Sequence, residues 1–365
     1  MPTTHEPVAP PVAARERAID SVLVAGAGRV GALVATLLQG AGYHVTTADA
    51  DATHEGVVAA DLSDAGVVEE LLGGCDAVVS CLPYDLNAAV ARAAHATGTH
   101  YFDLTEDVAT TATVRELSAS ASAAMVPQCG LAPGIICIVG AELLGRLDEP
   151  RSLELRVGAL PRHPSSALGY AFNWSPAGVV NEYLNDCEVV RDGQLKLVPA
   201  LGELETVVID GVRLEAFTTS GGAGTLCESY AGRIEQLDYK TLRYPGHCDL
   251  MRFFLGDLRL GRRRAEAERI LSDACPAVAE DVVYLYAAAV GMRGGRLVRE
   301  QFVRTYLPRE LQGRTHRAIS WTTAASACAM LELVASGRLP GRGMVRQEDV
   351  RLPDFLATEY GALFA

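Results

Sequence analysis

The sequence predicts an α/β protein made of a doubly wound parallel sheet and a second, α+β domain. Up to Gly134, short apolar runs alternate with amphipathic helical patterns, which is the order that a parallel sheet with helical crossovers requires. After Gly134, apolar residues mostly alternate with a period of two, which is typical of a mixed or antiparallel sheet. The chain has 365 residues, 49% of them hydrophobic, so it is long enough for two domains with separate cores.

The expected parallel sheet has six strands, which are separated by helical segments. The strands are predicted at residues 22–25, 45–48, 56–61, 76–81, 100–103 and 124–128. The helices between them are predicted at residues 32–38, 66–72, 87–97 and 108–122. Ligands of such sheets lie beyond the carboxyl ends of the strands, where the strand order reverses. We therefore expect the loops at 82–84, 104–107 and 129–134 to face a ligand.

The loop after the first strand carries the most specific signal in the chain. Gly26, Gly28 and Gly31 have the spacing G-x-G-x-x-G, which gives a tight turn, close approach to a pyrophosphate and close packing of helix and strand. The next helix adds free N–H groups at its N-terminus. Asp49 ends the second strand, where a carboxylate accepts from ribose hydroxyls and repels a 2′-phosphate. These residues predict an NAD-binding Rossmann domain, with NADP as the second choice; a glycine-rich turn without a ligand is the alternative.

The second domain is expected to combine paired strands with a few helices. Turn dipeptides at Asp192-Gly193 and Asp210-Gly211 separate apolar runs, as in β-hairpins. Strands are predicted at residues 153–157, 188–191, 206–209, 214–217, 281–291 and 296–306. Helices are predicted at residues 135–144, 318–336 and 355–360.

Charge and cysteine content exclude several classes of function. The net charge is −13, and the only tight basic cluster, Arg262 to Arg264, adjoins acidic residues, so we expect a solvated helix start there and no nucleic-acid partner. Nine cysteines without a C-x-x-C pair fit reduced thiols in the cytoplasm, and no spacing indicates a metal site. No apolar stretch is predicted to span a membrane. Residues 1–19 are expected to form a flexible tail rather than an export signal.

Three stretches of the second domain mix polar groups, aromatic rings and glycines. They are residues 169–176, in which Ser175 and Pro176 suit a helix start, residues 218–225 and residues 239–247. In the last stretch, Lys240, Arg243 and His247 suit an amino-acid carboxylate, and a strand would place Lys240 and Arg243 on different faces. His247 has the most suitable ordinary pKa for a general base. The structural alternatives are a helix cap with packing aromatics, a connecting loop, and a buried or solvated histidine.

Together, these motifs resemble the saccharopine dehydrogenase-like family over essentially the whole chain after the tail. The resemblance rests on the glycine loop with Asp49 and on the segments 82–84, 130–134, 168–175, 219–222 and 239–247. Members of the family include saccharopine reductases, L-lysine 6-dehydrogenase and carboxynorspermidine dehydrogenase. The chain departs from fungal saccharopine reductases in two ways: Asp49 favours NAD where those enzymes are expected to prefer NADP, and the chain is shorter. Glu106 is a further acid without an assigned counterpart.

The resemblance implies an NAD(P)-dependent oxidoreductase that acts on a carbon–nitrogen bond. It would oxidise a lysine-type amino acid, saccharopine or L-lysine, to an imine, or run the reverse reduction. It also implies a homodimer whose contact lies in the substrate domain. Three alternatives stay open: a carboxynorspermidine-type polyamine dehydrogenase, a non-catalytic NAD-binding sensor, and a carbonyl dehydrogenase of the aspartate-semialdehyde type with Cys129 as its thiol nucleophile.

The expected domains and site residues follow from the motifs and from the resemblance. The domains are a tail at 1–19, a Rossmann domain at 20–134, a substrate-binding and dimerisation domain at 135–307, and C-terminal helices at 308–365 that return to the Rossmann domain. The candidate catalytic residues are His247, Lys240 and Asp103. The candidate substrate-binding residues are Tyr170, Asn173, Trp174, Ser220, Arg243 and Tyr244. The candidate cofactor-binding residues are Gly26, Gly28, Arg29, Val30, Gly31, Asp49, Asp61, Cys81, Leu82, Pro83, Gly130, Leu131 and Pro133.

Overall fold

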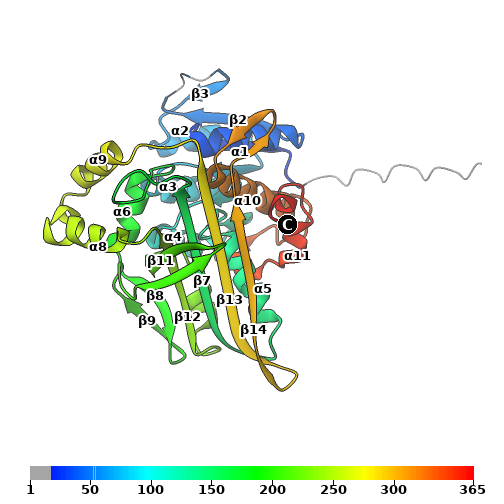
Figure 1. Cartoon of the computed structure of the whole chain (residues 1–365). Coiled ribbons are helices and arrows are strands. Elements are labelled where there is room, and N and C mark those ends of the chain that lie inside the picture. Colours follow the sequence, from blue (N-terminus) through cyan, green and yellow to red (C-terminus); the bar gives the residue numbers. More distant parts are fainter. Residues whose placement is uncertain (1–17, 52, 54) are drawn as a thin grey trace, which may run out of the picture.

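The chain folds around two sheets, and the predicted α/β fold class is confirmed (Figure 1). The computed structural model describes residues 18–51, 53 and 55–365. Most of the predicted N-terminal tail, residues 1–17, therefore lies outside the described residues. The last residue predicted to belong to that tail, Ile19, is fully buried in the core.

The first sheet is parallel throughout and has the strand order β17-β6-β5-β4-β1-β2-β3. Its strands are β1 (Ser21–Ala25), β2 (His44–Asp49), β3 (Val57–Ala59), β4 (Ala77–Ser80), β5 (His100–Asp103), β6 (Ala124–Val126) and β17 (Gly343–Met344). All six predicted strands are present. The order reverses between β1 and β4, which creates the crevice in which such sheets bind ligands. The seventh strand, β17, comes from the far end of the chain and was not predicted.

Helices cover both faces of this sheet because its strands are apolar on both sides. They are α1 (Arg29–Gly40), α2 (Ala65–Leu72), α3 (Tyr84–Thr97), α4 (Val108–Ser118) and α10 (Ala318–Ala335). Val22 and Val24 of β1 belong to the core shared with α1 and α10, whereas Leu23 and Ala25 belong to the core shared with α2 and α3. This alternation is what a strand buried on both faces requires.

The second sheet is mixed, as predicted, and has the order β10-β11-β12-β7-β13-β14, with β8 pairing to β12 and β9 to β8. Its strands are β7 (Glu149–Pro161), β8 (Cys187–Arg191), β9 (Gln194–Val198), β10 (Glu205–Ile209), β11 (Val212–Thr218), β12 (Gln236–Arg243), β13 (Asp281–Arg293) and β14 (Arg296–Tyr306). The β12–β7 pair is parallel, and the other pairs are antiparallel. Strand β9 was missed because its apolar residues are exposed at the sheet margin.

The remaining elements pack around the second sheet or join the two sheets. They are α5 (Ile135–Gly145), α6 (Pro176–Leu184), α7 (Leu226–Tyr230), α8 (His247–Arg252), α9 (Arg264–Ala274), the hairpin β15 (Arg309–Leu311) and β16 (Arg314–His316), and α11 (Leu352–Leu356). Ser175 caps α6 by accepting a hydrogen bond from the Gly178 N–H at 3.1 Å, as predicted. The helix predicted at 355–360 is displaced toward the N-terminus, because Pro353 is already within the first turn of α11.

The C-terminal part of the chain returns to the parallel sheet. Helix α10 packs against α1, and β17 pairs with β6. By length and composition, α10 is apolar enough to cross a membrane, although no such stretch was expected; 83% of it is buried inside this fold. A helix that is apolar all round is typical of a protein core as well as of a membrane span.

Candidate active site

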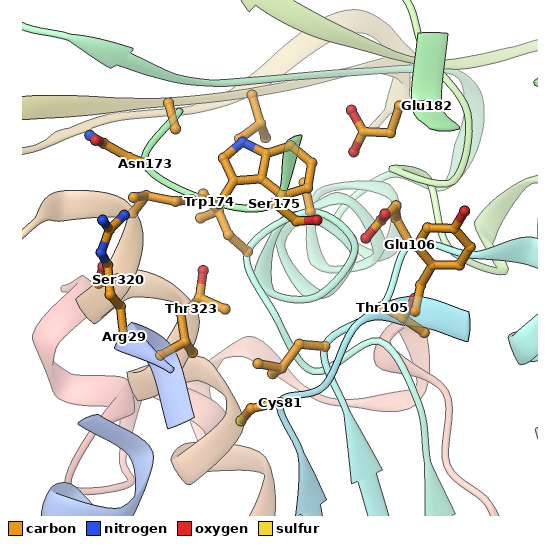
Figure 2. Close-up of a pocket in the computed structure, with 18 of the residues that line it drawn as sticks. Arg29, Cys81, Thr105, Glu106, Asn173, Trp174, Ser175, Glu182, Ser320 and Thr323 are labelled. Carbon is orange, nitrogen blue, oxygen red and sulfur yellow. The ribbon is translucent and has the colours of Figure 1, made fainter. Parts of the chain in front are cut away.

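A cavity of about 400 Å³ lies between the carboxyl ends of the parallel strands and the mixed sheet (Figure 2). The glycine loop and the loops after β4 and β5 line one side of it. Strands β7 and β12, residues 173–175 and Glu182 of α6 line the other. Eleven of the predicted site residues lie on its wall: Gly28, Arg29, Val30, Gly31, Cys81, Leu82, Pro83, Leu131, Asn173, Trp174 and Arg243.

The glycine loop has the geometry of a phosphate-binding turn. Gly26 has a φ of +100°, and a Cβ on Gly31 would lie 1.9 Å from the Gly26 carbonyl oxygen, so both positions require glycine. A Cβ on Gly28 would meet nothing within 4 Å, which leaves its backbone open to a ligand. No side chain caps the N-terminus of α1. The free N–H groups of that helix therefore fit a dinucleotide pyrophosphate.

Asp49 is close to this loop but does not line the cavity. Its Oδ2 accepts from the Ala27 N–H at 2.5 Å, and its Oδ1 accepts from the Asp51 N–H at 2.9 Å. Asp49 thus connects the end of β2 to the glycine loop, where a ribose would also lie. Asp61 is farther away, and its carboxylate accepts from the Ser63 N–H and hydroxyl.

The loop at 129–134 is tightly folded, and only part of it reaches the cavity. Leu131 lines the wall, whereas Gly130 and Pro133 do not. A Cβ on Gly134 would lie 1.7 Å from the Gly130 carbonyl oxygen, so the two ends of the loop touch. Cys129 is fully buried, donates its thiol to the Val126 carbonyl at 3.1 Å, and has its pKa raised by burial. A buried protonated thiol outside the cavity does not support the alternative of a cysteine nucleophile.

Asp103 supports the loop after β5 rather than the cavity wall. Its carboxylate accepts from the Tyr101 hydroxyl at 2.8 Å, the Gln128 N–H at 2.8 Å and the Thr105 N–H at 3.1 Å. Burial raises its pKa to about 6 in spite of these hydrogen bonds. The contact with Thr105 fixes the loop that carries Glu106.

Strand β12 divides its polar residues between two faces. Arg243 and the other odd-numbered residues Tyr239 and Thr241 line the cavity. The even-numbered Asp238 and Lys240 point to the opposite face, because side chains alternate along a strand.

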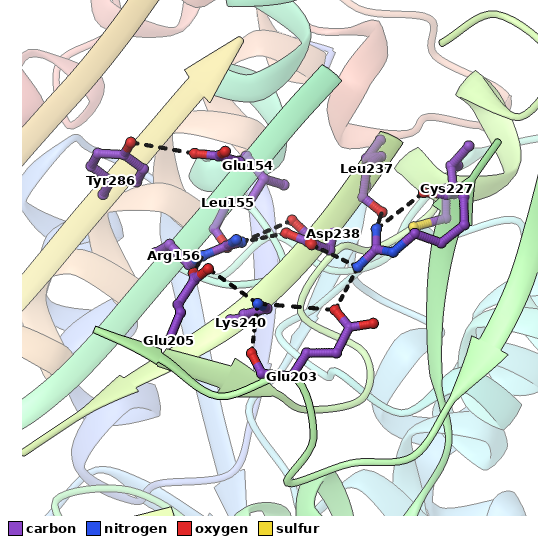
Figure 3. A network of polar contacts seen from close by, with 12 residues as sticks. Glu154, Leu155, Arg156, Glu203, Glu205, Cys227, Leu237, Asp238, Lys240 and Tyr286 are labelled. Carbon is purple, nitrogen blue, oxygen red and sulfur yellow. Dashed lines mark hydrogen bonds and ion pairs between the residues drawn. The ribbon is translucent and has the colours of Figure 1, made fainter. Parts of the chain in front are cut away.

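Lys240 belongs to an ion-pair network on this opposite face (Figure 3). Its Nζ donates to the Glu203 carbonyl at 2.7 Å and pairs with the Glu205 carboxylate at 3.2 Å. Asp238 pairs with Arg156 at 2.5 Å and Arg191 at 2.8 Å in the same network. The structure therefore does not bring Lys240 to the cavity.

Arg243 is held rigidly and points one end at the cavity. Its Nε donates to the Tyr183 hydroxyl at 2.9 Å, and its Nη1 donates to the Leu242 carbonyl at 2.8 Å. The guanidinium carbon lies 4.7 Å from the centre of the Tyr170 ring. Within the described part of the chain, Nη2 has no hydrogen-bond partner, so it remains free to bind an anionic group.

His247 stands behind Arg243 and does not line the cavity. Its Nδ1 lies 2.8 Å from the Leu168 carbonyl, and its Nε2 lies 3.1 Å from the Tyr183 hydroxyl. A carbonyl can only accept, so Nδ1 carries the proton and Nε2 accepts from Tyr183. Burial, together with the charge of Arg243, lowers the pKa of His247 to about 3. The imidazole is thus a neutral partner of Tyr183.

Two glutamates that had not been predicted as site residues line the cavity instead: Glu182, which is buried, and Glu106, which is half-buried. Glu106 follows β5, and Glu182 is on α6; both side chains are drawn on the same side of the cavity in Figure 2. Burial raises the pKa of Glu106 to about 7. Burial, followed by the negative charge of Glu106, raises the pKa of Glu182 well above its usual range. The two carboxyl groups therefore share one electrostatic environment.

Gly178 shows how closely Glu106 approaches α6. A Cβ on Gly178 would lie 3.0 Å from the Glu106 Oε1 and 2.7 Å from the Trp174 ring. Glu182 is one helical turn after Gly178, on the same face of α6. The Glu106 carboxyl thus lies against the helix face that presents Glu182.

The glycine-rich loop at 218–225 does not line the cavity but packs against residues that do. Gly221 has a φ of +82°, and a Cβ there would lie 2.1 Å from the Glu106 carbonyl oxygen. A Cβ on Gly222 would lie 2.2 Å from the Tyr239 ring. Ser220 donates its N–H to the Glu182 carbonyl at 3.1 Å and does not line the cavity. This loop therefore supports three residues of the cavity wall.

The aromatic stretch at 170–174 combines lining and support. Trp174 lines the cavity and donates its indole N–H to the Tyr170 hydroxyl at 2.9 Å. Asn173 also lines the cavity, and its Oδ1 accepts from the Val278 N–H at 2.9 Å. Tyr170 carries Arg243 on its ring but does not itself line the cavity. Tyr244 points away and donates to the Pro161 carbonyl at 3.0 Å.

Two family models cover almost all of the chain. The model described as the saccharopine dehydrogenase NADP binding domain matches residues 22–127, and the saccharopine dehydrogenase C-terminal domain matches residues 130–358. The chain belongs to the saccharopine dehydrogenase family. This confirms the predicted resemblance and the dinucleotide-binding character of the first domain.

Curated relatives of this family match parts of the chain at low identity. The saccharopine dehydrogenase [NADP(+), L-glutamate-forming] of Schizosaccharomyces pombe is 25% identical over 155 residues, which are 41% of this chain and 34% of the relative. The enzyme of the same name from Saccharomyces cerevisiae is 26% identical over 150 residues, 39% of this chain and 33% of the relative. The matched region thus spans about a third of the length of these relatives.

Solved structures agree with the fold of the saccharopine dehydrogenase family. Apo saccharopine dehydrogenase (L-Glu forming) from Saccharomyces cerevisiae has a TM-score of 0.71 at 16% identity, covering 92% of this chain and 95% of that one. DAP dehydrogenase of C. glutamicum has a TM-score of 0.50 at 12% identity, covering 95% of this chain and 98% of the other. At these identities the likeness concerns the fold alone.

The cavity of this family member brings three kinds of chemical group together. They are the open backbone of the glycine loop, the guanidinium groups of Arg29 and Arg243, and two carboxyl groups with raised pKa. No group of three or more His, Cys, Asp or Glu side chains suited to a metal ion occurs in the parts of the chain described. The arrangement suits binding of a dinucleotide next to an amino acid, with a carboxyl group placed to accept a proton.

Proposed function

We propose that this chain is an NAD(P)-dependent dehydrogenase that oxidises a carbon–nitrogen bond of a lysine-type amino acid, saccharopine or L-lysine, to an imine, or catalyses the reverse reduction. The observation that carries the proposal is that Arg243, Glu106 and Glu182 line the same cavity as the glycine loop. A protein that only sensed the cofactor would not need buried ionisable groups at this place, because burying them costs stability.

The glycine loop would hold the cofactor, with Leu82, Pro83 and Leu131 beside the nicotinamide end. The nicotinamide supplies the hydride acceptor when the cofactor is bound. The open position above Gly28 and the uncapped start of α1 support this assignment, since a pyrophosphate fits both. The remaining task of the protein is to align the substrate carbon and to handle protons.

Arg243 would bind the substrate carboxylate through its free Nη2. Tyr183 and the Tyr170 ring fix the guanidinium, so little side-chain entropy is lost when a ligand binds. Arg243 stays charged although it is buried, because a guanidinium keeps its proton in proteins.

Glu106 would accept the proton of the substrate ammonium. Loss of this proton leaves a neutral amine. Its nitrogen lone pair forms the C=N bond while the neighbouring carbon loses a hydride, which is a hydrogen with its bonding electron pair. The product is an iminium ion, which loses a proton or is hydrolysed by water. A pKa of about 7 suits a group that must both take and return a proton near neutral pH. His247 and Asp103 would position other groups, and Lys240 takes no part.

For the cofactor, we propose NAD as the preferred form and NADP as the second. Asp49 next to the glycine loop supports NAD, because its charge would repel a 2′-phosphate. The printed names of the relatives and of the matching domain specify NADP, which favours the other choice. The preferred cofactor is found by comparing kcat/KM with NAD and kcat/KM with NADP. Asp49→Ser should shift this ratio toward NADP.

The proposed reaction is tested by following formation of the reduced cofactor with a panel of amines. L-Lysine, L-saccharopine and a carboxylated polyamine are each combined with NAD and with NADP. Activity with one of these and its loss in Glu106→Gln would support the proposal. Tight cofactor binding without turnover of any amine would favour the non-catalytic alternative.

We also propose a homodimer that works in the cytoplasm. The family resemblance supports the dimer, and nine cysteines without a disulfide support a reducing compartment. Light scattering of the purified chain after size-exclusion chromatography tests the first of these points, and cell fractionation tests the second.

A further inference from the structure

The positively and negatively charged groups on the cavity wall are unevenly distributed between its two ends. Among the described residues, four charged side chains line the cavity: Arg29, Glu106, Glu182 and Arg243. Arg29 is exposed at the start of α1, next to the phosphate-binding loop. Figure 2 shows Arg29 beside Ser320, across the cavity from both glutamates, with Trp174 between them. The substrate half of the cavity therefore has one cation and two acids.

Among the described residues, no further cation lines the cavity; Arg317, at the start of α10, interacts electrostatically with Arg29 next to the phosphate-binding loop. Arg156 and Lys240 lie on the opposite face of the mixed sheet, where Asp238, Glu203 and Glu205 neutralise them. Their side chains are only 4% and 6% exposed and cannot turn through the sheet. His247 is enclosed between Tyr183 and Leu168, so it adds no charge.

We infer that the substrate carries a single carboxylate and at least two basic nitrogens. This inference rests on the proposed function, which places the substrate in this cavity. Arg243 neutralises one carboxylate. An ammonium group bound beside either glutamate favours the ionised form of that carboxyl group, so two ammonium groups can each pair with one carboxylate. With both pairs formed, the ligand and the substrate half of the cavity together carry no net charge.

Di- and tricarboxylates do not fit the same balance. A second carboxylate in the substrate half of the cavity would lie near Glu106 and Glu182, where like charges repel each other. Saccharopine has three carboxylates, so the cavity disfavours the substrate named for the curated relatives. L-Lysine, with one carboxylate and two amino groups, has the composition that the site selects, and so has a polyamine with one carboxylate.

Ligand binding without turnover tests the inference. The full chain is saturated with NADH, so that an amine cannot be oxidised, and is titrated calorimetrically with four probes: L-lysine, L-norleucine, L-2-aminoadipate and L-saccharopine. The first three have similar chain lengths and end in an ammonium, a methyl and a carboxylate group. We expect L-lysine to bind about tenfold tighter than norleucine and about 100-fold tighter than the two acids.

Glu182→Gln identifies the group that makes this distinction. In this variant the preference for L-lysine over norleucine should fall at least threefold. Glu268→Gln, a change on α9 outside the cavity, is the control and should leave the preference unchanged. Thermal unfolding of each variant shows whether it is folded, and Glu106→Gln provides a second variant if Glu182→Gln does not fold.

The outcomes separate the substrate class from the reaction. If L-saccharopine or 2-aminoadipate binds as tightly as L-lysine, if L-lysine does not bind, or if the folded glutamate variants keep the full preference, the inference is wrong. If L-lysine binds with the expected preference but no amine reduces NAD or NADP, the proposed reaction fails and the substrate class stands. Turnover of saccharopine but not of L-lysine would overturn the substrate class and leave the reaction in place.

Discussion

The Nε of Arg243 donates a hydrogen bond to the Tyr183 hydroxyl at 2.9 Å, and this bond determines how the cation faces the cavity. The same hydroxyl donates to His247, whose Nδ1 is fixed by the Leu168 carbonyl. The Tyr183 hydroxyl and the His247 imidazole thus each use both their donor and their acceptor. His247, whose pKa is about 3, therefore stays neutral near pH 7. Through Tyr183 it holds Arg243 in place without exchanging a proton.

Removing the Tyr183 hydroxyl should weaken substrate binding more than turnover. Tyr183→Phe leaves Arg243 Nε and His247 Nε2 without partners, and each loss costs about 1–3 kcal/mol. We expect KM to rise roughly tenfold while kcat stays within about threefold. Phe217→Leu provides the control, because the Phe217 ring lies against His247 but its side chain takes no part in the hydrogen bonds between Arg243, Tyr183 and His247. An unchanged KM in Tyr183→Phe would contradict the positioning role.

His247 should tolerate an uncharged hydrogen-bond acceptor but not an apolar side chain. His247→Gln can still accept from Tyr183, whereas His247→Leu cannot, so the leucine variant should resemble Tyr183→Phe. Because burial lowers the pKa of His247 to about 3, the unmodified protein and His247→Gln should differ by the same factor at pH 6 and pH 9. Equal and complete inactivity of both variants would instead indicate a catalytic base at this position.

The pH dependence of amine oxidation should reflect Glu106. Its pKa of about 7 means that the proton-accepting, ionised form increases as the pH rises. We expect kcat/KM to rise about tenfold per pH unit below pH 7 and to level off above it. Glu106→Gln should lose about 100-fold or more in kcat and lose this limb of the profile. Glu116→Gln, an exposed position on α4, should retain it.

The same glutamates should make the protein less stable at higher pH. The pKa of Glu106 is higher in the folded than in the unfolded state, so its contribution is fully present below about pH 4.5 and is lost as the pH rises through 7. The difference amounts to about 3 kcal/mol for Glu106. Chemical denaturation at pH 5 and pH 8 should therefore show a smaller fall in unfolding free energy for Glu106→Gln than for the unmodified protein. A parallel fall in both would show that Glu106 does not titrate in this range.

Lys240 and Arg243 should respond oppositely to substitution although both are buried cations of one strand. Lys240→Met breaks contacts with two partly exposed glutamates, which solvent can compensate, so we expect a loss of about 1–2 kcal/mol in stability and a KM within about twofold. Arg243→Lys keeps the charge but loses the fixed fork, and should raise KM about 30-fold. Lys196→Met, an exposed ion pair on β9, is the control for stability. A large rise of KM in Lys240→Met would instead indicate that Lys240 takes part in substrate binding.

The parallel sheet could be predicted because its signals are local. Each of its first six strands is a short apolar run, and Gly26 and Gly31 mark the turn by positions that no Cβ can occupy. Strand β17 could not be predicted, since two residues carry no pattern and pair only after α10 has returned to the sheet.

The site was harder to predict because burial, and not residue type alone, determines the pKa of each group and whether it lines the cavity. His247 has the ordinary pKa of a base, but the cavity wall excludes it, whereas Glu106 acquires such a pKa only through burial. Glu106 could have been found from its position in a loop at the strand ends, where a ligand was expected. Glu182 gives no comparable signal, since only the packing of α6 brings it to Glu106.

The last prediction concerns Gly221, whose replacement should displace Glu106. Gly221→Ala combines a positive φ with a Cβ 2.1 Å from the Glu106 carbonyl oxygen, so the backbone of the loop after β5 must shift. Gly232→Ala has a similar φ of +77° but would meet nothing within 4 Å, so it isolates the cost of the backbone conformation. We expect both variants to lose about 1 kcal/mol from strain, and only Gly221→Ala to lose at least tenfold in kcat/KM. Equal activity of the two variants would show that the loop at 218–225 does not control the placement of Glu106.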